Sequence, residues 1–153
     1  MCSSDLPYRY VTTILRGVDL TGVRSLAELS GRIRLAAEKA KPGRTIYATG
    51  RWSEADIAEK RGPTRQELDS LVPDHPVLIL ERGGNAYLNT AALKTAGIDH
   101  KTRALAGETG SVPKDPNGEP TGVIVDSSAI LVARLVPMDD LRKIGRASCR
   151  ERV

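Results

Sequence analysis

The chain has 153 residues, a formal net charge of +4 and 3% aromatic residues, and it contains no block of lysine and arginine. Nucleic-acid binding is therefore not favoured, because neither a basic stripe that tracks phosphates nor a base-stacking platform is present. No apolar stretch approaches the ~20 residues of a membrane-spanning helix, so we predict no membrane partner. The expected location is the cytoplasm, although the lack of a signal-peptide pattern at the start of the chain carries no information about it.

Both ends of the chain read as translated sequencing-adapter sequence. The first six residues are MCSSDL and the last ten are IGRASCRERV. Each of these peptides is the translation of a common library-adapter sequence. We therefore expect adapter-derived tails at 1–6 and 144–153 around a natural segment at 7–143; the alternative is an Arg-rich terminal helix or nucleic-acid arm. Both cysteines, Cys2 and Cys149, lie in the tails. Disulfide frameworks, CxxC redox chemistry and Cys-ligated zinc are thus excluded for the remainder.

The first half of the chain predicts a strand, a helix and a second strand. Tyr10–Leu20 is β-branched and apolar, which favours a strand. Ser25 and Glu28 have the spacing of a capping box at the start of a helix. Apolar residues follow at helical spacing, namely Leu26, Leu29, Ile33, Ala37 and Ala40. Pro42-Gly43 ends this helix, and Thr45–Ala48 is a short candidate for a buried strand.

The central region continues the alternation of helices and strands. Thr64–Leu71 opens with a second capping box and predicts a short helix. Val77–Leu80 is a continuous apolar run, which is typical of a strand covered on both faces in a parallel sheet. Asn89 is a suitable cap for a helix over Ala91–Ala96, and Gly97 is a suitable stop. The alternation predicts βαβ units and an α/β fold.

The character of the sequence changes after residue 98. Gly107–Pro120 is rich in turn-forming residues and predicts an exposed, inserted excursion. Thr121–Val125 could form a short strand, and Ala129–Val136 a helix that ends at Pro137.

Residues with metal-binding or nucleophilic chemistry are sparse. The two histidines, His75 and His100, lie in predicted loops without a second ligand at metal-binding spacing, so both are interpreted as exposed loop residues. No serine lies in a GxSxG elbow. The charged residues between Glu54 and Lys60 are interpreted as a solvated segment.

Three residues are candidates for a substrate pocket. The turn after the strand at 77–80 contains Gly83-Gly84 but matches neither phosphate-binding glycine motif. Ligands meet the carboxyl ends of strands in parallel α/β sheets, so Arg82 and Asn85 are predicted to line a pocket. Trp52, the sole tryptophan, also follows a predicted strand; it is either a substrate wall or a residue packed on the next helix.

Four stretches together resemble the amidohydrolase superfamily, in the branch that contains N-substituted formamide deformylases. They lie in the family's order and at roughly its spacing: Val18–Leu29, Gly50–Trp52, Pro63–Ile98 and Lys114–Pro137. Two positions depart from the pattern. The family usually has a second glycine before Trp52, and it commonly has a histidine where this chain has Asn85. The second departure removes an acid/base group but leaves a residue that can hydrogen-bond a substrate.

The resemblance implies a partial (β/α)₈ TIM-barrel fragment whose parent enzyme hydrolyses amide or formamide C–N bonds. It also implies zinc or a similar divalent metal in the parent protein, which would activate water and polarise the scissile carbonyl. The matched stretches fall between the family's metal-binding motifs, so we expect this fragment to contain no catalytic residue and to bind no metal.

The expected partner is a small-molecule amide or formamide, bound by Trp52, Arg82 and Asn85. The alternative is a non-catalytic α/β binding module in which Arg82, Gly84 and Asn85 hold a small anionic ligand. The sequence leaves the oligomeric state open.

Overall fold

The computed structural model describes residues 17–102, 111–125 and 135. Both predicted tails, the strand residues 10–16 and most of the predicted helix at 129–136 lie outside these ranges. Within them, the chain forms a mixed α/β fold around one sheet, as the alternation of patterns predicts. No helix in these ranges is long and apolar enough to cross a bilayer.

Five short strands form the sheet, and their order in space follows their order in the chain. They are β1 (Val18–Asp19), β2 (Ile46–Thr49), β3 (Val77–Leu80), β4 (Ala86–Leu88) and β5 (Val123–Ile124). The first three strands are parallel, whereas β4 is antiparallel to both β3 and β5. The carboxyl ends of the three parallel strands therefore meet at one edge of the sheet.

The helices begin where the sequence places caps. They are α2 (Leu26–Lys39), the 3-10 turn η1 (Glu54–Asp56), α3 (Arg65–Leu71) and α4 (Thr90–Ala96). Thr64 and Glu67 form the predicted capping box of α3. Ser25 caps α2 by accepting from the Glu28 amide, although the Glu28 carboxylate accepts from the Arg24 amide rather than from Ser25.

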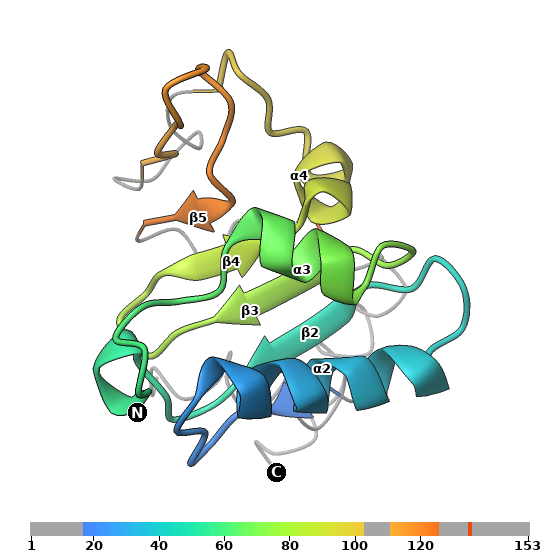
Figure 1. The fold of residues 1–153 in the computed structure, drawn as a ribbon. Coiled ribbons are helices and arrows are strands. Elements are labelled where there is room, and N and C mark those ends of the chain that lie inside the picture. Colours follow the sequence, from blue (N-terminus) through green and yellow to red (C-terminus); the bar gives the residue numbers. More distant parts are fainter. Residues whose placement is uncertain (1–16, 103–110, 126–134, 136–153) are drawn as a thin grey trace, which may run out of the picture.

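Alternation along the strands divides the core into two layers. In β2 and β3, Ile46, Ala48, Val77 and Ile79 face α2 and α3, which lie in front of the sheet in Figure 1. The intervening side chains of β2 and β3 face the other way and pack with apolar residues of α4. Leu135 belongs to this second layer, and its carbonyl accepts a hydrogen bond of 2.6 Å from the Tyr47 hydroxyl.

A buried amide ties α3, β3 and α4 together. Asn89 is 1% exposed and caps α4, as predicted. Its Oδ1 accepts from the Val77 and Ala92 amides at 3.0 and 2.9 Å, and its Nδ2 donates to the Val72 and His75 carbonyls at 3.2 and 2.7 Å. Oδ1 thus accepts two hydrogen bonds and Nδ2 donates two, so the side-chain amide is fully satisfied. This favours one geometry for the junction.

The prediction for the segment after β3 was wrong in one respect. The glycine turn does not lead from a strand into a helix, because it closes a hairpin between β3 and β4. Gly84 occupies the left-handed region, with φ of 94°, and its amide donates to the Glu81 carbonyl at 3.1 Å. β4 was missed because its three residues lie directly before the helix cap, where strand periodicity cannot develop.

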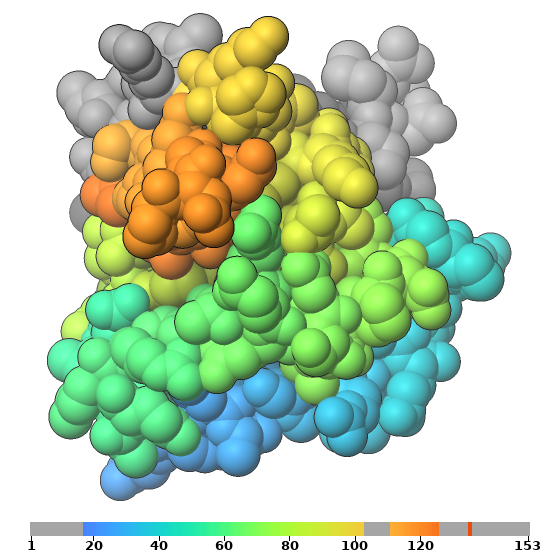
Figure 2. Space-filling model, turned by 45° about the horizontal axis from the view of Figure 1, so that its top comes forward, coloured from blue at the N-terminus to red at the C-terminus, as the bar shows by residue number. Residues whose placement is uncertain are grey.

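The predicted excursion is described only from residue 111 onward. It forms a small turn structure, with bridges between Ser111 and Val125 and between Lys114 and Pro120. Figure 2 shows this segment, in orange, against the yellow residues around α4. Its turn residues Pro116, Asn117 and Glu119 are exposed, as predicted, whereas Val112 is buried at 5% exposure.

Candidate functional site

A polar cluster lies at the carboxyl edge of the sheet. Two segments form it: the loop 50–62, which follows β2, and the turn 81–85, which joins β3 to β4. The Arg82 amide donates to the Trp52 carbonyl at 3.2 Å, and the Glu54 amide donates to the Glu81 carboxylate at 3.1 Å. These two bonds hold the loop and the turn together.

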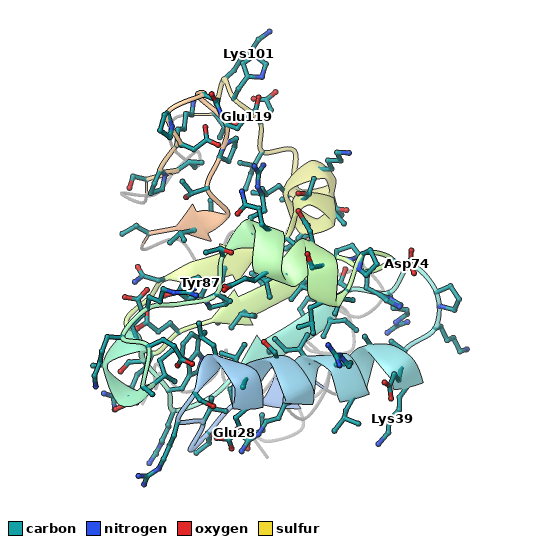
Figure 3. All side chains as sticks on the ribbon, viewed as in Figure 1. Glu28, Lys39, Asp74, Tyr87, Lys101 and Glu119 are labelled. Atoms are coloured by element: carbon teal, nitrogen blue, oxygen red, sulfur yellow. The ribbon has the colours of Figure 1, made fainter. Side chains whose placement is uncertain are left out.

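The Tyr87 hydroxyl lies between two carboxylates. It donates to Glu54 Oε1 at 2.7 Å and lies 3.3 Å from Glu81 Oε2, and the Gly62 amide also donates to Glu54 at 3.1 Å. Figure 3 shows the Tyr87 side chain at the sheet edge that faces this loop. Burial raises the pKa of the Tyr87 hydroxyl above its usual range, and the adjacent carboxylates raise it further. The phenol is therefore a hydrogen-bond donor here and not a general base.

Close packing fixes the loop on the Tyr87 ring. A Cβ at Gly62 would lie 2.1 Å from a carbon of that ring, so only glycine lets the backbone approach this closely. The Trp52 and Tyr87 ring centroids are 5.7 Å apart with planes tilted by 42°, a favourable aromatic arrangement.

The three predicted site residues lie in this region but differ in exposure. Trp52 is fully buried, and its Nε1 donates to the Leu80 carbonyl at 3.0 Å. Arg82 is exposed at the tip of the turn. Asn85 is half-buried, and its Nδ2 donates to Glu81 Oε2 at 2.9 Å. The structure therefore brings Arg82 and Asn85 to one turn and packs Trp52 beneath them.

The geometry of the turn does not favour an anion. An anion site needs free backbone N–H groups, yet the amides of Glu81, Arg82 and Gly84 all donate to carbonyl oxygens. The Glu81 carboxylate, which accepts from the Asn85 side chain, would also repel a negative ligand. Of the three residues named in the alternative hypothesis, the Gly84 amide and the Asn85 NH₂ group already have acceptors, whereas the exposed Arg82 guanidinium stays a candidate donor to an anion.

A second turn lies at the same edge, after β1. Asp19 Oδ1 accepts from the Thr21 amide at 2.8 Å, and hydrogen bonds from the Thr21 hydroxyl and then from this amide lower the pKa of the Asp19 carboxyl. Arg32 donates to the Asp19 and Thr21 carbonyls at 2.9 and 3.1 Å. A Cβ at Gly50 would lie 2.5 Å from the Thr21 amide nitrogen, so glycine allows the ends of β1 and β2 to touch.

The histidines do not take part in this site. His75 was predicted to be exposed but is 8% exposed, and its Nδ1 lies 2.9 Å from the Arg44 carbonyl. His100 is exposed, and its carbonyl accepts from the Lys114 ammonium. Within 17–102, 111–125 and 135, no three His, Cys, Asp or Glu side chains converge as metal ligands. The described residues therefore do not fit the metal that the resemblance implies.

Sequence reasoning missed the central residues of the cluster. Glu54 was assigned to a solvated segment, but it accepts from Tyr87 and Gly62, and Glu59 accepts from the Leu26 amide at 3.0 Å. Neither carboxylate has a distinctive spacing in the sequence. The available signal for Tyr87 was its place six residues after Glu81, across a glycine turn, which is compatible with a hairpin.

The chain matches one known protein family over most of its length. The profile of the amidohydrolase family matches residues 8–150, which is nearly the whole chain. The chain belongs to the amidohydrolase family. The family resemblance in the four sequence stretches is thereby confirmed.

Three curated relatives align with parts of this family member. "Putative amidohydrolase YtcJ" of Bacillus subtilis (strain 168) is 39% identical over 87 residues, which are 56% of this chain and 16% of that protein. Protein LONG AFTER FAR-RED 3 of Arabidopsis thaliana is 33% identical over 116 residues, 75% of this chain and 19% of that protein. N-substituted formamide deformylase of Arthrobacter pascens is 36% identical over 77 residues, 50% of this chain and 14% of that protein. Each alignment thus spans less than a fifth of the relative.

Two solved structures resemble the fold. An uncharacterized metal-dependent hydrolase of Pyrococcus horikoshii OT3 superposes with a TM-score of 0.56 at 25% identity, over 88% of this chain and 24% of that one. A second uncharacterized metal-dependent hydrolase, from Pyrococcus furiosus, gives 0.51 at 27% identity, over 91% and 23% of the two chains. Both support a mixed α/β portion of a hydrolase fold; a closed TIM barrel is not shown by the five strands described here.

Proposed function

We propose that the chain is a segment of a metal-dependent amidohydrolase that cleaves amide or formamide C–N bonds. The membership in the amidohydrolase family carries this proposal, and the formamide specificity is supported by the deformylase among its relatives. In such a hydrolysis, water adds to the carbonyl carbon, the C–N bond breaks, and a carboxylic acid and an amine leave.

The proposed role of this segment is to form a substrate-binding wall. Ligands of parallel α/β sheets meet the carboxyl ends of the strands, which is the edge that bears Arg82 and Asn85. Trp52 is fully buried, so in this proposal its ring packs behind Arg82 and Asn85 and supports the wall. The partner that we propose is a small amide or formamide.

The metal, zinc or a similar divalent ion, belongs in this proposal to the longer protein. When bound it would supply a Lewis acid and an activated water. The described residues of this chain bind and orient, and no step of the chemistry is assigned to them. Location in the cytoplasm and a (β/α)₈ barrel for the longer protein are parts of the same proposal.

The test compares the chain with the longer protein encoded at its locus. We expect the longer protein to release formate from N-substituted formamides, to lose this activity on chelation and to regain it with zinc. We expect the 153-residue chain to be inactive. After dialysis it should retain less than about 0.1 equivalent of zinc, whereas a true structural zinc site would keep its metal through dialysis. A stoichiometric, tightly held zinc in the chain, or a longer protein without amide hydrolysis, would contradict the proposal.

A binding variant adds a second readout. Arg82→Ala in the longer protein should raise KM with little change in kcat, since an exposed side chain at the turn contacts substrate without reaching the scissile bond. Arg34→Ala, on the exposed face of α2, is the matched control and should change neither value.

A further inference from the structure

The side-chain amide of Asn85 has one defined orientation. Its Nδ2 donates to Glu81 Oε2 at 2.9 Å, and an ionised carboxylate can only accept hydrogen bonds. The nitrogen must therefore face Glu81, and Oδ1 must point the other way. Within the described part of the chain, Oδ1 makes no hydrogen bond, and the side chain is only half-buried. The turn thus presents one open acceptor at the carboxyl edge of the sheet.

The Glu81 carboxylate is itself held in place. Its Oε1 accepts from the Glu54 amide at 3.1 Å, and its Oε2 lies 3.3 Å from the Tyr87 hydroxyl. The Glu81 amide also donates to the Asn85 carbonyl at 2.9 Å, so the two residues are joined through both backbone and side chain. Rotating the Asn85 amide by half a turn would place its oxygen against a carboxylate oxygen, which is repulsive.

We propose that Asn85 is a specificity-determining residue that accepts a hydrogen bond from a substrate N–H, and that Glu81 is the positioning residue that sets its orientation. This inference rests on the proposed function, because it refines the substrate class at the same edge. It selects amides that retain an N–H, such as monosubstituted formamides, over disubstituted ones. The Glu81 carboxylate beside Asn85 also favours a donor over an anion.

The selectivity can be measured as binding to the 153-residue chain by NMR titration. The two probes are N-methylformamide, which has one N–H, and N,N-dimethylformamide, which has none. We expect shifts at the Asn85 side-chain signals and a Kd for N-methylformamide about five-fold lower, the ratio that one modest hydrogen bond supplies. In Asn85→Ala the ratio of the two Kd values should fall to the baseline set by the size of the probes alone.

Glu81→Gln separates positioning from simple stability. A glutamine can keep an oxygen toward the Glu54 amide and turn its own NH₂ toward Asn85, which should rotate the Asn85 amide so that Nδ2 faces outward. Both probes have a carbonyl acceptor, so the variant should bind them alike. Glu38→Gln, an exposed position on α2, removes the same charge elsewhere and should keep the five-fold preference. Trp52 fluorescence reports whether each variant is folded.

The outcomes are distinct. Equal Kd values for the two probes in the unmodified chain, no binding of either probe, or a preserved preference in Asn85→Ala would each overturn the inference. If Glu81→Gln does not fold, Asn85→Ala still decides whether Asn85 recognises the N–H. A longer protein that hydrolyses no amide refutes the proposed function but leaves the binding ratio as a separate result.

Discussion

The buried amide of Asn89 makes the strongest prediction about stability. Two of its four hydrogen bonds require an acceptor and two require a donor. Asn89→Asp keeps both acceptor bonds and the α4 cap, but it loses both donor bonds. It also places a carboxylate oxygen at the position now 2.7 Å from the His75 carbonyl and 3.2 Å from that of Val72. Loss of two buried hydrogen bonds together with repulsion costs about 3 to 5 kcal/mol.

The matched control is Ser25→Ala, which removes a cap of the same kind from α2. Ser25 is half-buried and accepts only from the Glu28 amide, so its loss should cost about 1 kcal/mol. The assay is urea unfolding of each variant, followed by the fluorescence of Trp52, the sole tryptophan, which is fully buried. The two free energies of unfolding should differ by at least about 2 kcal/mol, as the difference of these two costs.

The pH dependence of Asn89→Asp has a definite sign. Repulsion by the carbonyls and burial raise the pKa of the introduced carboxyl in the folded state above its unfolded value. The folded state then binds the proton more tightly, so the deficit relative to the unmodified chain should shrink as the pH falls from 7 toward 4. An Asn89→Asp variant no less stable than Ser25→Ala, or a deficit that grows on acidification, would refute the reasoning.

Three further predictions concern close contacts and charge. Gly62→Ala should destabilise the chain by about 1 to 3 kcal/mol in the same urea assay, because its Cβ meets the buried ring of Tyr87. Gly50→Ala should cost at least as much, since its Cβ meets backbone that cannot turn away, and Gly31→Ala, where a Cβ meets nothing within 4 Å, is the control. The hydrogen bond from Arg61, aided by the Thr64 amide, lowers the pKa of Glu67 to about 2. The contribution of the ionised Glu67 carboxylate to the free energy of unfolding is therefore present above about pH 4.5 and is lost as the pH falls toward 2. Because both side chains are almost half exposed, Arg61→Gln should lower the free energy of unfolding only slightly at pH 7, and this difference should shrink as the pH falls toward 2. A constant difference across that range would contradict this assignment.

Local signals in the sequence were sufficient for most of the elements. The caps at Thr64 and Asn89 and the apolar run at Val77–Leu80 act through neighbours in the chain, so their structures can be predicted without knowledge of distant contacts. β2 lies within one residue of its predicted range. The strand predicted at Tyr10–Leu20 is described only as Val18–Asp19, because the residues before 17 lie outside the described ranges.

The polar cluster could not be predicted in the same way. Glu54 and Tyr87 are 33 positions apart, and their contact depends on the turn that β3 and β4 make between Glu81 and Asn85. The sequence places Arg82 and Asn85 correctly on that turn, but it does not show which side of the Asn85 amide faces outward. That orientation depends on a carboxylate whose own position depends on the loop after β2.

The strand order has a consequence for how this part of the protein is made. Every neighbouring pair of strands in the sheet is also consecutive in the chain. Each strand can therefore join the growing edge as soon as it leaves the ribosome, and no later strand has to be inserted between two that have already paired. Only the β3–β4 closure, across the turn 81–85, is short, whereas the other three connections each contain a helix and its loops. The β3–β4 hairpin is the closure with the lowest entropic cost, so β4 can pair with β3 as soon as both strands are available.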